Sequence, residues 1–209
     1  MKNPNQRRDM GSLIVEQIIS ADGYAAGLDG SIDFFVNARS INEADKDQLH
    51  LLERVGAIVL GRTTYGMFAS YWPQADPLEE PVAAPLNALP KYVVSNTLTQ
   101  APWEGSGESA TVLRGDGVAS VRSLRERVDG DLIVWGSLTL CDALLRAGQV
   151  DRLRLRMVPV LIGAGRSFAP RDIGQRALAL KSVKEYPEGL VVLEYQCPRN
   201  QAEPRIGSA

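Results

Sequence analysis

The sequence predicts an α/β domain built on a mixed, mostly parallel sheet with helices on both of its faces. Short apolar runs rich in β-branched residues, typical of strands buried on both faces, occupy residues 57–60, 92–94 and 132–135. Helical patterns alternate with these runs, which is the order of βαβ units in a parallel sheet. The last third instead alternates polar and apolar residues and ends in a tight turn, so an antiparallel hairpin is expected there.

Length and charge limit the class of protein. A chain of 209 residues with 44% hydrophobic content can form one sizeable domain, which we expect over residues 11–198, between a disordered leader at 1–10 and a disordered tail at 199–209. Lys and Arg total 23 against 25 Asp and Glu, with no basic stripe, which argues against nucleic acid and anionic membranes as main partners.

The rare residue types exclude several kinds of site. His50 is the only histidine, and Cys141 and Cys197 lie far apart in the sequence. Histidine-based metal sites and Ser-His-Asp triads therefore lack their parts, and we expect no metal. The widely spaced cysteines and the lack of an apolar signal segment fit a reducing cytoplasm.

The first half of the chain begins with a strand and a glycine-rich loop. Residues 13–20 are expected to form the strand, and residues 21–30, with three glycines and two acids, a loop that can approach a ligand closely or simply turn the chain. Residues 42–55 have the pattern of an amphipathic helix packed on the sheet, with His50 beside its apolar face, on the helix surface.

The most informative stretch is a strand that passes through one glycine into a helix. The apolar run 57–60 ends at Gly61, and Arg62, Thr63 and Thr64 open a helical pattern. Such a junction directs backbone N–H groups and the positive end of the helix dipole toward whatever binds above it, and the side chains add donors suited to phosphate. An ordinary strand–turn–helix with a threonine cap has the same pattern.

Similar junctions recur downstream. Residues 74–90 form a proline-rich irregular excursion, after which the strand at 92–94 ends in Ser95, Asn96 and Thr97. A short strand at 111–113 and a helix at 118–128 follow. The strand at 132–135 then ends at Gly136 and Ser137, where a helix begins that stops at Gly148.

The remaining elements are strands. Residues 152–158 alternate arginine with apolar residues, which predicts a strand with one wetter face. Residues 178–186 and 190–195 form the hairpin around a Pro-Glu-Gly turn. The Gly-Ala-Gly at 163–165 lacks the strand–helix context of a dinucleotide fingerprint and is interpreted as a turn.

Three strand ends thus carry chemistry suited to phosphate. Ligands of open α/β sheets bind beyond the carboxyl ends of the strands, so parallel strands would place all three junctions on one edge. Two helix N-termini could then hold a pyrophosphate, and the middle loop a further phosphate or a ribose. The pattern favours a nucleotide with several phosphates.

These motifs, in this order, resemble the dihydrofolate reductase-like group that includes the reductase domain of riboflavin biosynthesis proteins, the RibD C-terminal family. The resemblance spans roughly residues 13–197 and is carried by Ile19 to Tyr24, Gly61 to Tyr65, Tyr71 to Pro73, Val94 to Thr97, Trp135 to Leu138 and Pro159 to Gly165. It implies the three-layer dihydrofolate reductase-like fold, NADPH as cofactor and, as often in that family, a homodimer.

The resemblance also implies roles for individual residues. The Arg62 and Ser95 loops would hold the 2′-phosphate side of NADPH and part of the pyrophosphate, the Gly136 loop would take the pyrophosphate from the other side, and the Ala21 region would lie against the nicotinamide. The expected cofactor-binding residues are Ala21, Gly61, Arg62, Thr63, Thr64, Ser95, Asn96, Thr97, Gly136, Ser137, Leu138 and Thr139.

The substrate does not follow from the resemblance. The Leu-Pro-Trp motif of dihydrofolate reductases and the Asp-Asp-Pro of riboflavin-pathway reductases have no match here, and no motif marks the buried acid on the first helix. By position, Asp29, Asp33, Phe34, Tyr71 and Trp72 are expected to line a substrate pocket. The proton is expected either from water or from a buried acid such as Asp33. Each of these residues also has a structural interpretation, such as a helix cap for Asp33 and core packing for Trp72.

The expected function is hydride transfer from NADPH to a C=N or C=O bond of a small heterocyclic substrate resembling a pterin or a pyrimidinone. Two alternatives remain. One is a non-catalytic NADPH-binding or sensor protein on the same fold. The other is a different α/β enzyme that binds a phosphorylated metabolite through one helix N-terminus.

Overall fold

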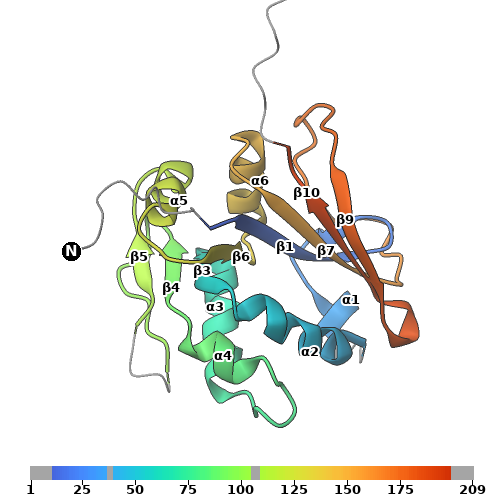
Figure 1. The fold of residues 1–209 in the computed structure, drawn as a ribbon, viewed down its shortest axis with the longest axis horizontal. Helices are drawn as coiled ribbons and strands as arrows, with labels where there is room; N and C mark the ends of the chain where they lie inside the picture. The colour runs from blue at the N-terminus through green and yellow to red at the C-terminus, as the bar shows by residue number, and fades with distance from the viewer. Residues whose placement is uncertain (1–10, 37–39, 105–108, 199–209) are drawn as a thin grey trace, which may run out of the picture.

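A computed structural model describes residues 11–36, 40–104 and 109–198 of the chain (Figure 1). Its centre is an eight-stranded sheet with the strand order β5-β4-β3-β6-β1-β7-β10-β9. A separate two-stranded sheet pairs β2 with β8. The leader and tail expected at 1–10 and 199–209 lie outside the described residues. Within these residues, no helix is both long and apolar enough to cross a membrane.

The six strands from β5 to β7 run parallel, and β10 runs antiparallel to both of its neighbours. The mixed sheet with an antiparallel C-terminal hairpin is therefore confirmed. The strands are β1 Leu13–Ser20, β2 Tyr24–Ala26, β3 Val55–Gly61, β4 Lys91–Val94, β5 Thr111–Leu113, β6 Asp131–Val134, β7 Arg152–Val158, β8 Arg166–Ser167, β9 Ala179–Glu185 and β10 Val191–Gln196.

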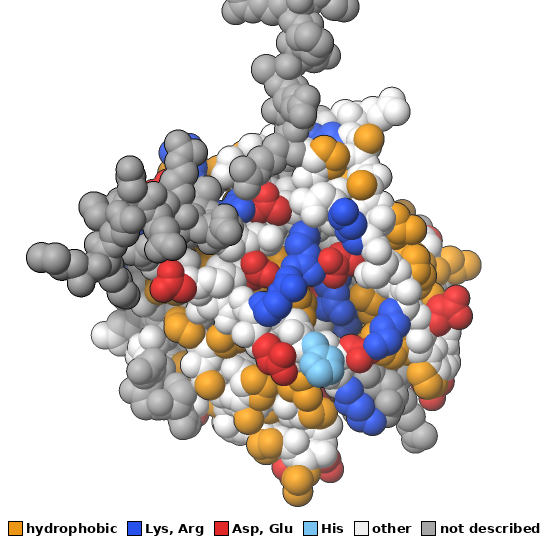
Figure 2. Space-filling model, viewed as in Figure 1, with side chains coloured by type: hydrophobic (Ala, Val, Ile, Leu, Met, Phe, Trp, Pro, Cys, Tyr) orange, Lys and Arg blue, Asp and Glu red, His pale blue; other side chains and the backbone are white. Residues whose placement is uncertain are grey.

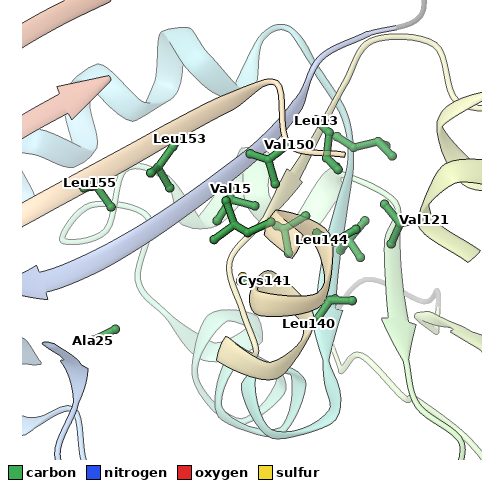
Figure 3. Packing of buried hydrophobic residues seen from close by; sticks show 14 of the residues in the cluster. Leu13, Val15, Ala25, Val121, Leu140, Cys141, Leu144, Val150, Leu153 and Leu155 are labelled. Carbon is green, nitrogen blue, oxygen red and sulfur yellow. The ribbon is translucent and has the colours of Figure 1, made fainter. Parts of the chain in front are cut away.

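Helices cover both faces of the sheet, and each face has its own hydrophobic core. On one face, α5 (Gly117–Arg125) and α6 (Leu138–Arg146) bury Leu124 and Leu144 with Val15 of β1 (Figure 3). On the other, α2 (Ser40–Leu52), α3 (Arg62–Tyr71) and α4 (Ala83–Ala88) pack on alternate residues of the same strands, such as Ile14 and Ile58. In Figure 1, α5 and α6 lie toward the top of the view, α2 and α4 toward the bottom.

The structure differs from the expected elements in a few places. The helix expected to reach Val55 ends at Leu52, and Val55 already belongs to β3. The proline-rich excursion contains the short helices η1 (Trp72–Gln74) and α4. Pro85 is tolerated in α4 because it lies in the first turn, where its missing N–H has no helical partner. The strands β2 and β8 and the four-residue α1 (Asp33–Val36) are too short for a periodic pattern.

The topology determines where the site lies. Strands β4, β3 and β6 are parallel neighbours, so their carboxyl ends meet at one edge of the sheet. The three junctions singled out in the sequence follow these strands. Helices α3 and α6 begin at that edge although they pack on opposite faces.

Candidate functional site

A cavity of about 560 Å³ opens at this edge of the sheet. Its wall is made by the starts of α3 and α6, the end of β6, strands β1, β2 and β7, and helix α2. A smaller cavity of about 220 Å³ lies at the opposite edge, at the amino-terminal ends of β4 and β5, away from the three junctions. The larger cavity is the candidate functional site.

The end of β3 and the loop after β6 are in direct contact. The N–H of Gly61 donates to the carbonyl oxygen of Gly136 over 2.8 Å. A Cβ at Gly61 would overlap the Ser137 hydroxyl and lie 2.8 Å from the Ser137 nitrogen. A Cβ at Gly136, whose φ is +119°, would lie 2.6 Å from Thr64 Oγ1. Only glycine at both positions allows the two junctions to approach this closely.

Both helix starts keep backbone donors for a ligand. Gly61 is the N-cap of α3 and Ser137 that of α6, and neither makes a side-chain cap. The first N–H groups of a helix have no intrahelical partner and lie at the positive end of the dipole. Thr63, Thr64, Ser137 and Thr139 line the cavity here. Two adjacent, uncapped N-termini fit a pyrophosphate, so the donor set present suits a dinucleotide.

The loop after β4 lies beside the start of α3. The Arg62 guanidinium donates to Thr97 Oγ1 over 3.1 Å, and both side chains are exposed. Ser95 Oγ accepts from the N–H of Leu98, and Asn96 Oδ1 from the N–H of Gly115, so these two side chains hold the loop itself. The three junctions therefore meet along one edge, as the sequence predicts, with Arg62 and Thr97 outermost.

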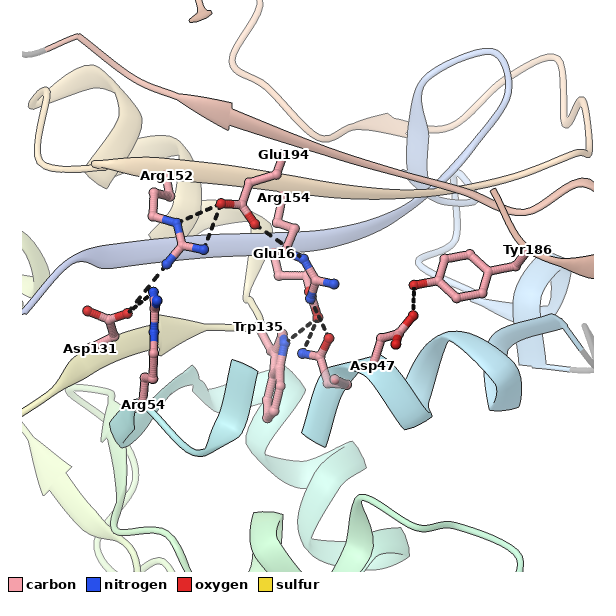
Figure 4. Close-up of polar contacts among 10 residues, drawn as sticks. Glu16, Asp47, Arg54, Asp131, Trp135, Arg152, Arg154, Tyr186 and Glu194 are labelled. Atoms are coloured by element: carbon pink, nitrogen blue, oxygen red, sulfur yellow. Dashed lines mark hydrogen bonds and ion pairs between the residues drawn. The ribbon is translucent and has the colours of Figure 1, made fainter. Parts of the chain in front are cut away.

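The deep wall of the cavity contains a buried carboxylate, Glu16, whose side chain is 3% exposed. Glu16 Oε1 accepts from Trp135 Nε1 at 2.8 Å and from Gln48 Nε2 at 2.9 Å. Its Oε2 pairs with Arg154 Nη1 at 2.5 Å, and the same nitrogen donates to Gln48 Oε1. Figure 4 shows Glu16 of β1, Arg154 of β7 and Trp135, the residue after β6, pointing toward one another.

A second buried acid, Asp45 of α2, also lines the cavity. Its Oδ1 accepts from Arg156 Nη2 at 2.6 Å. Burial raises the pKa of the Asp45 carboxyl above its usual range, although the adjacent Arg156 acts in the opposite direction. Asp45 was not predicted from the sequence. The available signal was the pair Asp45 and Gln48, which lie one turn apart on the face of α2 that also carries Ala44 and Leu52.

Strand β7 is therefore less exposed than its pattern predicts. Arg154 and Arg156 are 8% and 6% exposed, so the expected wetter face is wrong for these positions. Helix α2 covers that face and supplies Asp45 and Gln48. Further along, Arg152 pairs with Glu194 of β10 at 2.6 Å. Figure 2 shows charged side chains of both signs gathered in the middle of this face of the molecule.

Aromatic rings form another part of the wall. The ring centroids of Trp135 and Phe68 lie 5.7 Å apart, and those of Phe68 and Trp72 6.0 Å apart. Tyr71 continues the row, and its hydroxyl donates to Glu80 Oε1 over 2.7 Å, which raises the pKa of Tyr71 to about 12. The cavity thus combines a flat apolar surface with buried carboxylates, which suits a planar polar ring.

Of the residues predicted to line a substrate pocket, Tyr71 and Trp72 line the cavity, and Asp29, Asp33 and Phe34 are not among its lining residues. The expected burial of Asp33 is wrong, because its side chain is exposed at the start of α1. Asp29 accepts from the N–H of Ser31 in an exposed turn. Phe34 packs edge-on against Phe35, and it is Phe35 that reaches the cavity.

Two further residues considered in the sequence, Ala21 and His50, lie outside the cavity lining. Ala21 is exposed, and its N–H donates to the carbonyl of Val160 over 2.8 Å, so it lies beside the loop after β7 and is not among the lining residues. His50 lies on the helix surface, with its side chain 81% exposed, as the sequence predicts.

Comparison with known proteins identifies the family of the chain and similar folds. The sequence model described as the RibD C-terminal domain matches residues 12–192. A solved structure of a protein of Shewanella sp. PV-4 assigned to riboflavin biosynthesis is similar with a TM-score of 0.72 and 24% identity, covering 90% of this chain and 99% of that one.

Two more distant structures share the fold. Dihydrofolate reductase of Enterococcus faecalis, complexed with NADP(H) and RAB-propyl, is similar with a TM-score of 0.57 and 15% identity, covering 90% of this chain and 97% of that one. A diaminohydroxyphosphoribosylaminopyrimidine deaminase/5-amino-6-(5-phosphoribosylamino)uracil reductase of Thermotoga maritima has a TM-score of 0.62 and 15% identity, over 90% and 57% of the two chains. The dihydrofolate reductase-like fold is thus confirmed.

The contact between the Gly61 and Gly136 junctions can be tested by adding a single methyl group at Gly61. Gly61→Ala should weaken the binding of a dinucleotide at this edge about tenfold in a fluorescence titration with NADPH as the probe, because the new Cβ displaces Ser137 from the anion-binding helix start. Gly66→Ala is the matched control, since a Cβ at Gly66, in the same helix, meets nothing within 4 Å. Equal affinities for the two variants would contradict the importance of the contact.

Proposed function

This chain belongs to the RibD C-terminal domain family, and from that premise we propose that it is an NADPH-dependent reductase of a small heterocyclic substrate resembling a pterin or a pyrimidinone. One observation carries the proposal: two uncapped helix N-termini meet at the mouth of a cavity that has an aromatic wall and buried carboxylates. The similar fold of a dihydrofolate reductase complexed with NADP(H) supports the cofactor. The similar fold of the Thermotoga maritima uracil reductase supports a pyrimidinone-like substrate.

The residues at the edge would divide the cofactor between them. Backbone N–H groups at Thr63, Thr64 and Ser137 to Thr139 suit the pyrophosphate. Arg62, held outward by Thr97, suits the 2′-phosphate, because a guanidinium donates two parallel hydrogen bonds to phosphate oxygens. When bound, NADPH supplies a hydride to the carbon of the C=N or C=O bond.

The nitrogen or oxygen of the reduced bond must also gain a proton. Asp45 is the group in the cavity suited to this task, because it is buried and its raised pKa favours the protonated form. It takes the role that the sequence analysis assigned to Asp33. Glu16 is less suited, since both of its oxygens already accept hydrogen bonds or pair with Arg154.

A homodimer is part of the proposal. On the outermost strand β9, Leu180 and Val183 are 55% and 52% exposed, and their register partners on β10 are Tyr195 and Leu193. This apolar face at the edge of the sheet, defined by these four residues, is the kind of surface that association buries.

The cofactor assignment is tested first by a thermal-shift screen of NADPH, NADH and sugar phosphates, in which selective stabilisation by NADPH is expected. Arg62→Ala should then weaken NADPH binding about tenfold and leave NADH binding unchanged, since only NADPH carries the 2′-phosphate. Equal losses for both nucleotides, or none, would contradict the role of Arg62. NADPH binding without turnover of any pterin, pyrimidinone or imine would indicate a sensor instead of a reductase.

Asp45→Asn tests the proton donor. The wild-type kcat should fall as the pH rises through the raised pKa of Asp45, because only the protonated carboxyl donates. The variant should lose about 100-fold in kcat and this limb of the pH profile. Asp47→Asn is the control on the same helix: Asp47 accepts from the Tyr186 hydroxyl, is not among the cavity-lining residues, and kcat should stay within about twofold of wild type. An unchanged pH profile in Asp45→Asn would rule Asp45 out.

The dimer is tested by light scattering coupled to size-exclusion chromatography. Val183→Lys should convert the dimer to a monomer, because it places a charge in the centre of the apolar face. Ser182→Lys, on the opposite face of the same strand, should leave the dimer intact. A wild-type monomer, or a dimer in both variants, would contradict this interface.

A further inference from the structure

Glu16 is placed to control the orientation of Trp135. The indole has a single N–H, and it donates to Glu16 Oε1 over 2.8 Å. The carboxylate is itself immobilised by Gln48 on the same oxygen and by Arg154 on the other. Groups from α2, from β7 and from the residue after β6 thus converge on one carboxylate of β1, with the Glu16 side chain 3% exposed.

Trp135 lies between the proposed pyrophosphate loop and the row of aromatic side chains in the cavity wall. It directly follows β6 and directly precedes Gly136, at the start of the proposed pyrophosphate loop. Its ring also heads the aromatic row, tilted by 37° against Phe68. The hydrogen bond to Glu16 therefore fixes a flat surface beside the point where the cofactor loop begins.

The polar groups of this network are already engaged with one another. Each oxygen of Glu16 has a charged or polar partner, and the Trp135 N–H is used. Neither group is therefore suited to exchange a proton with a substrate. What the arrangement offers is rigidity, because a ring held by packing and by a charge-assisted hydrogen bond keeps one orientation.

We propose that Glu16 is a positioning residue that locks the indole of Trp135 as the surface on which the planar ring of the substrate stacks, and so sets the angle at which the ring meets the hydride donor. The inference rests on the proposed reductase function. It predicts an effect on kcat, since orientation affects the reacting geometry, and little effect on NADPH affinity.

A double-mutant cycle tests whether Glu16 acts through Trp135. Glu16→Gln and Trp135→Phe should each lower kcat about tenfold with 5-amino-6-(5-phosphoribosylamino)uracil or 7,8-dihydropterin as the probe, and the double variant should be no worse than either. The NADPH dissociation constant should stay within about twofold of wild type, which also shows that the variants fold. If Glu16→Gln lowers kcat by the same factor in the wild type and in the Trp135→Phe variant, the inference is wrong.

A ligand-free measurement separates this inference from the proposed function. The emission of Trp135, taken as the difference between wild type and Trp135→Phe, should shift and become more accessible to acrylamide in Glu16→Gln. Asp47→Asn removes a carboxylate that contacts Tyr186 and Lys184 but not Glu16, Arg154 or Trp135, and should leave this emission unchanged. Unchanged emission in Glu16→Gln would overturn the inference even if the protein is a reductase. Changed emission without turnover of either probe would leave the locked indole standing and overturn its role in a reduction.

Discussion

The close contact between Gly61 and Gly136 is the constraint on which the rest of the site depends. Helices α3 and α6 pack on opposite faces of the sheet, so their N-termini can meet only beyond the ends of the strands that precede them. The parallel pairing of β3 with β6 aligns these strand ends, and the absence of side chains lets the backbones form a hydrogen bond. The N-termini of α3 and α6, which carry partial positive charge, thereby lie side by side. A bound anion would stabilise this arrangement.

The deep wall of the cavity beyond this contact is stabilised differently, by largely buried arginines that each contact an acid. Arginines at every second position of β7 point to one face, and each contacts an acid from another element: Arg152 pairs with Glu194 and Arg154 with Glu16, whereas Arg156 donates to Asp45, whose protonated form is favoured by burial. Removing one partner of such a pair leaves an uncompensated buried charge, so the set is held together as a unit. Of this set, Glu16, Asp45 and Arg156 line the cavity, so their pairing holds that part of the wall in place.

The sequence predicted the sheet and the strand–glycine–helix junctions well, because these depend on local composition: Gly61 and Gly136 each end a short apolar strand before a helical pattern. The sequence did not predict the buried pairs of arginine and acid in the wall of the cavity. Asp45 and Arg156 are 111 residues apart, and Glu16 and Arg154 are 138 apart, so no local pattern links them. The alternation along β7 indicated a wet face because arginine is usually exposed, and only the tertiary placement of α2 reverses this.

The partner of Arg152 has a consequence for how the molecule is completed during synthesis. Glu194 belongs to β10, the last strand of the sheet, and it pairs with Arg152 and approaches Arg154 Nε to 3.8 Å. Until β10 has left the ribosome and docked on β7, these arginines lack one of the acids that balance their charge. The charge network behind the indole is therefore complete only when β10 has paired with β7.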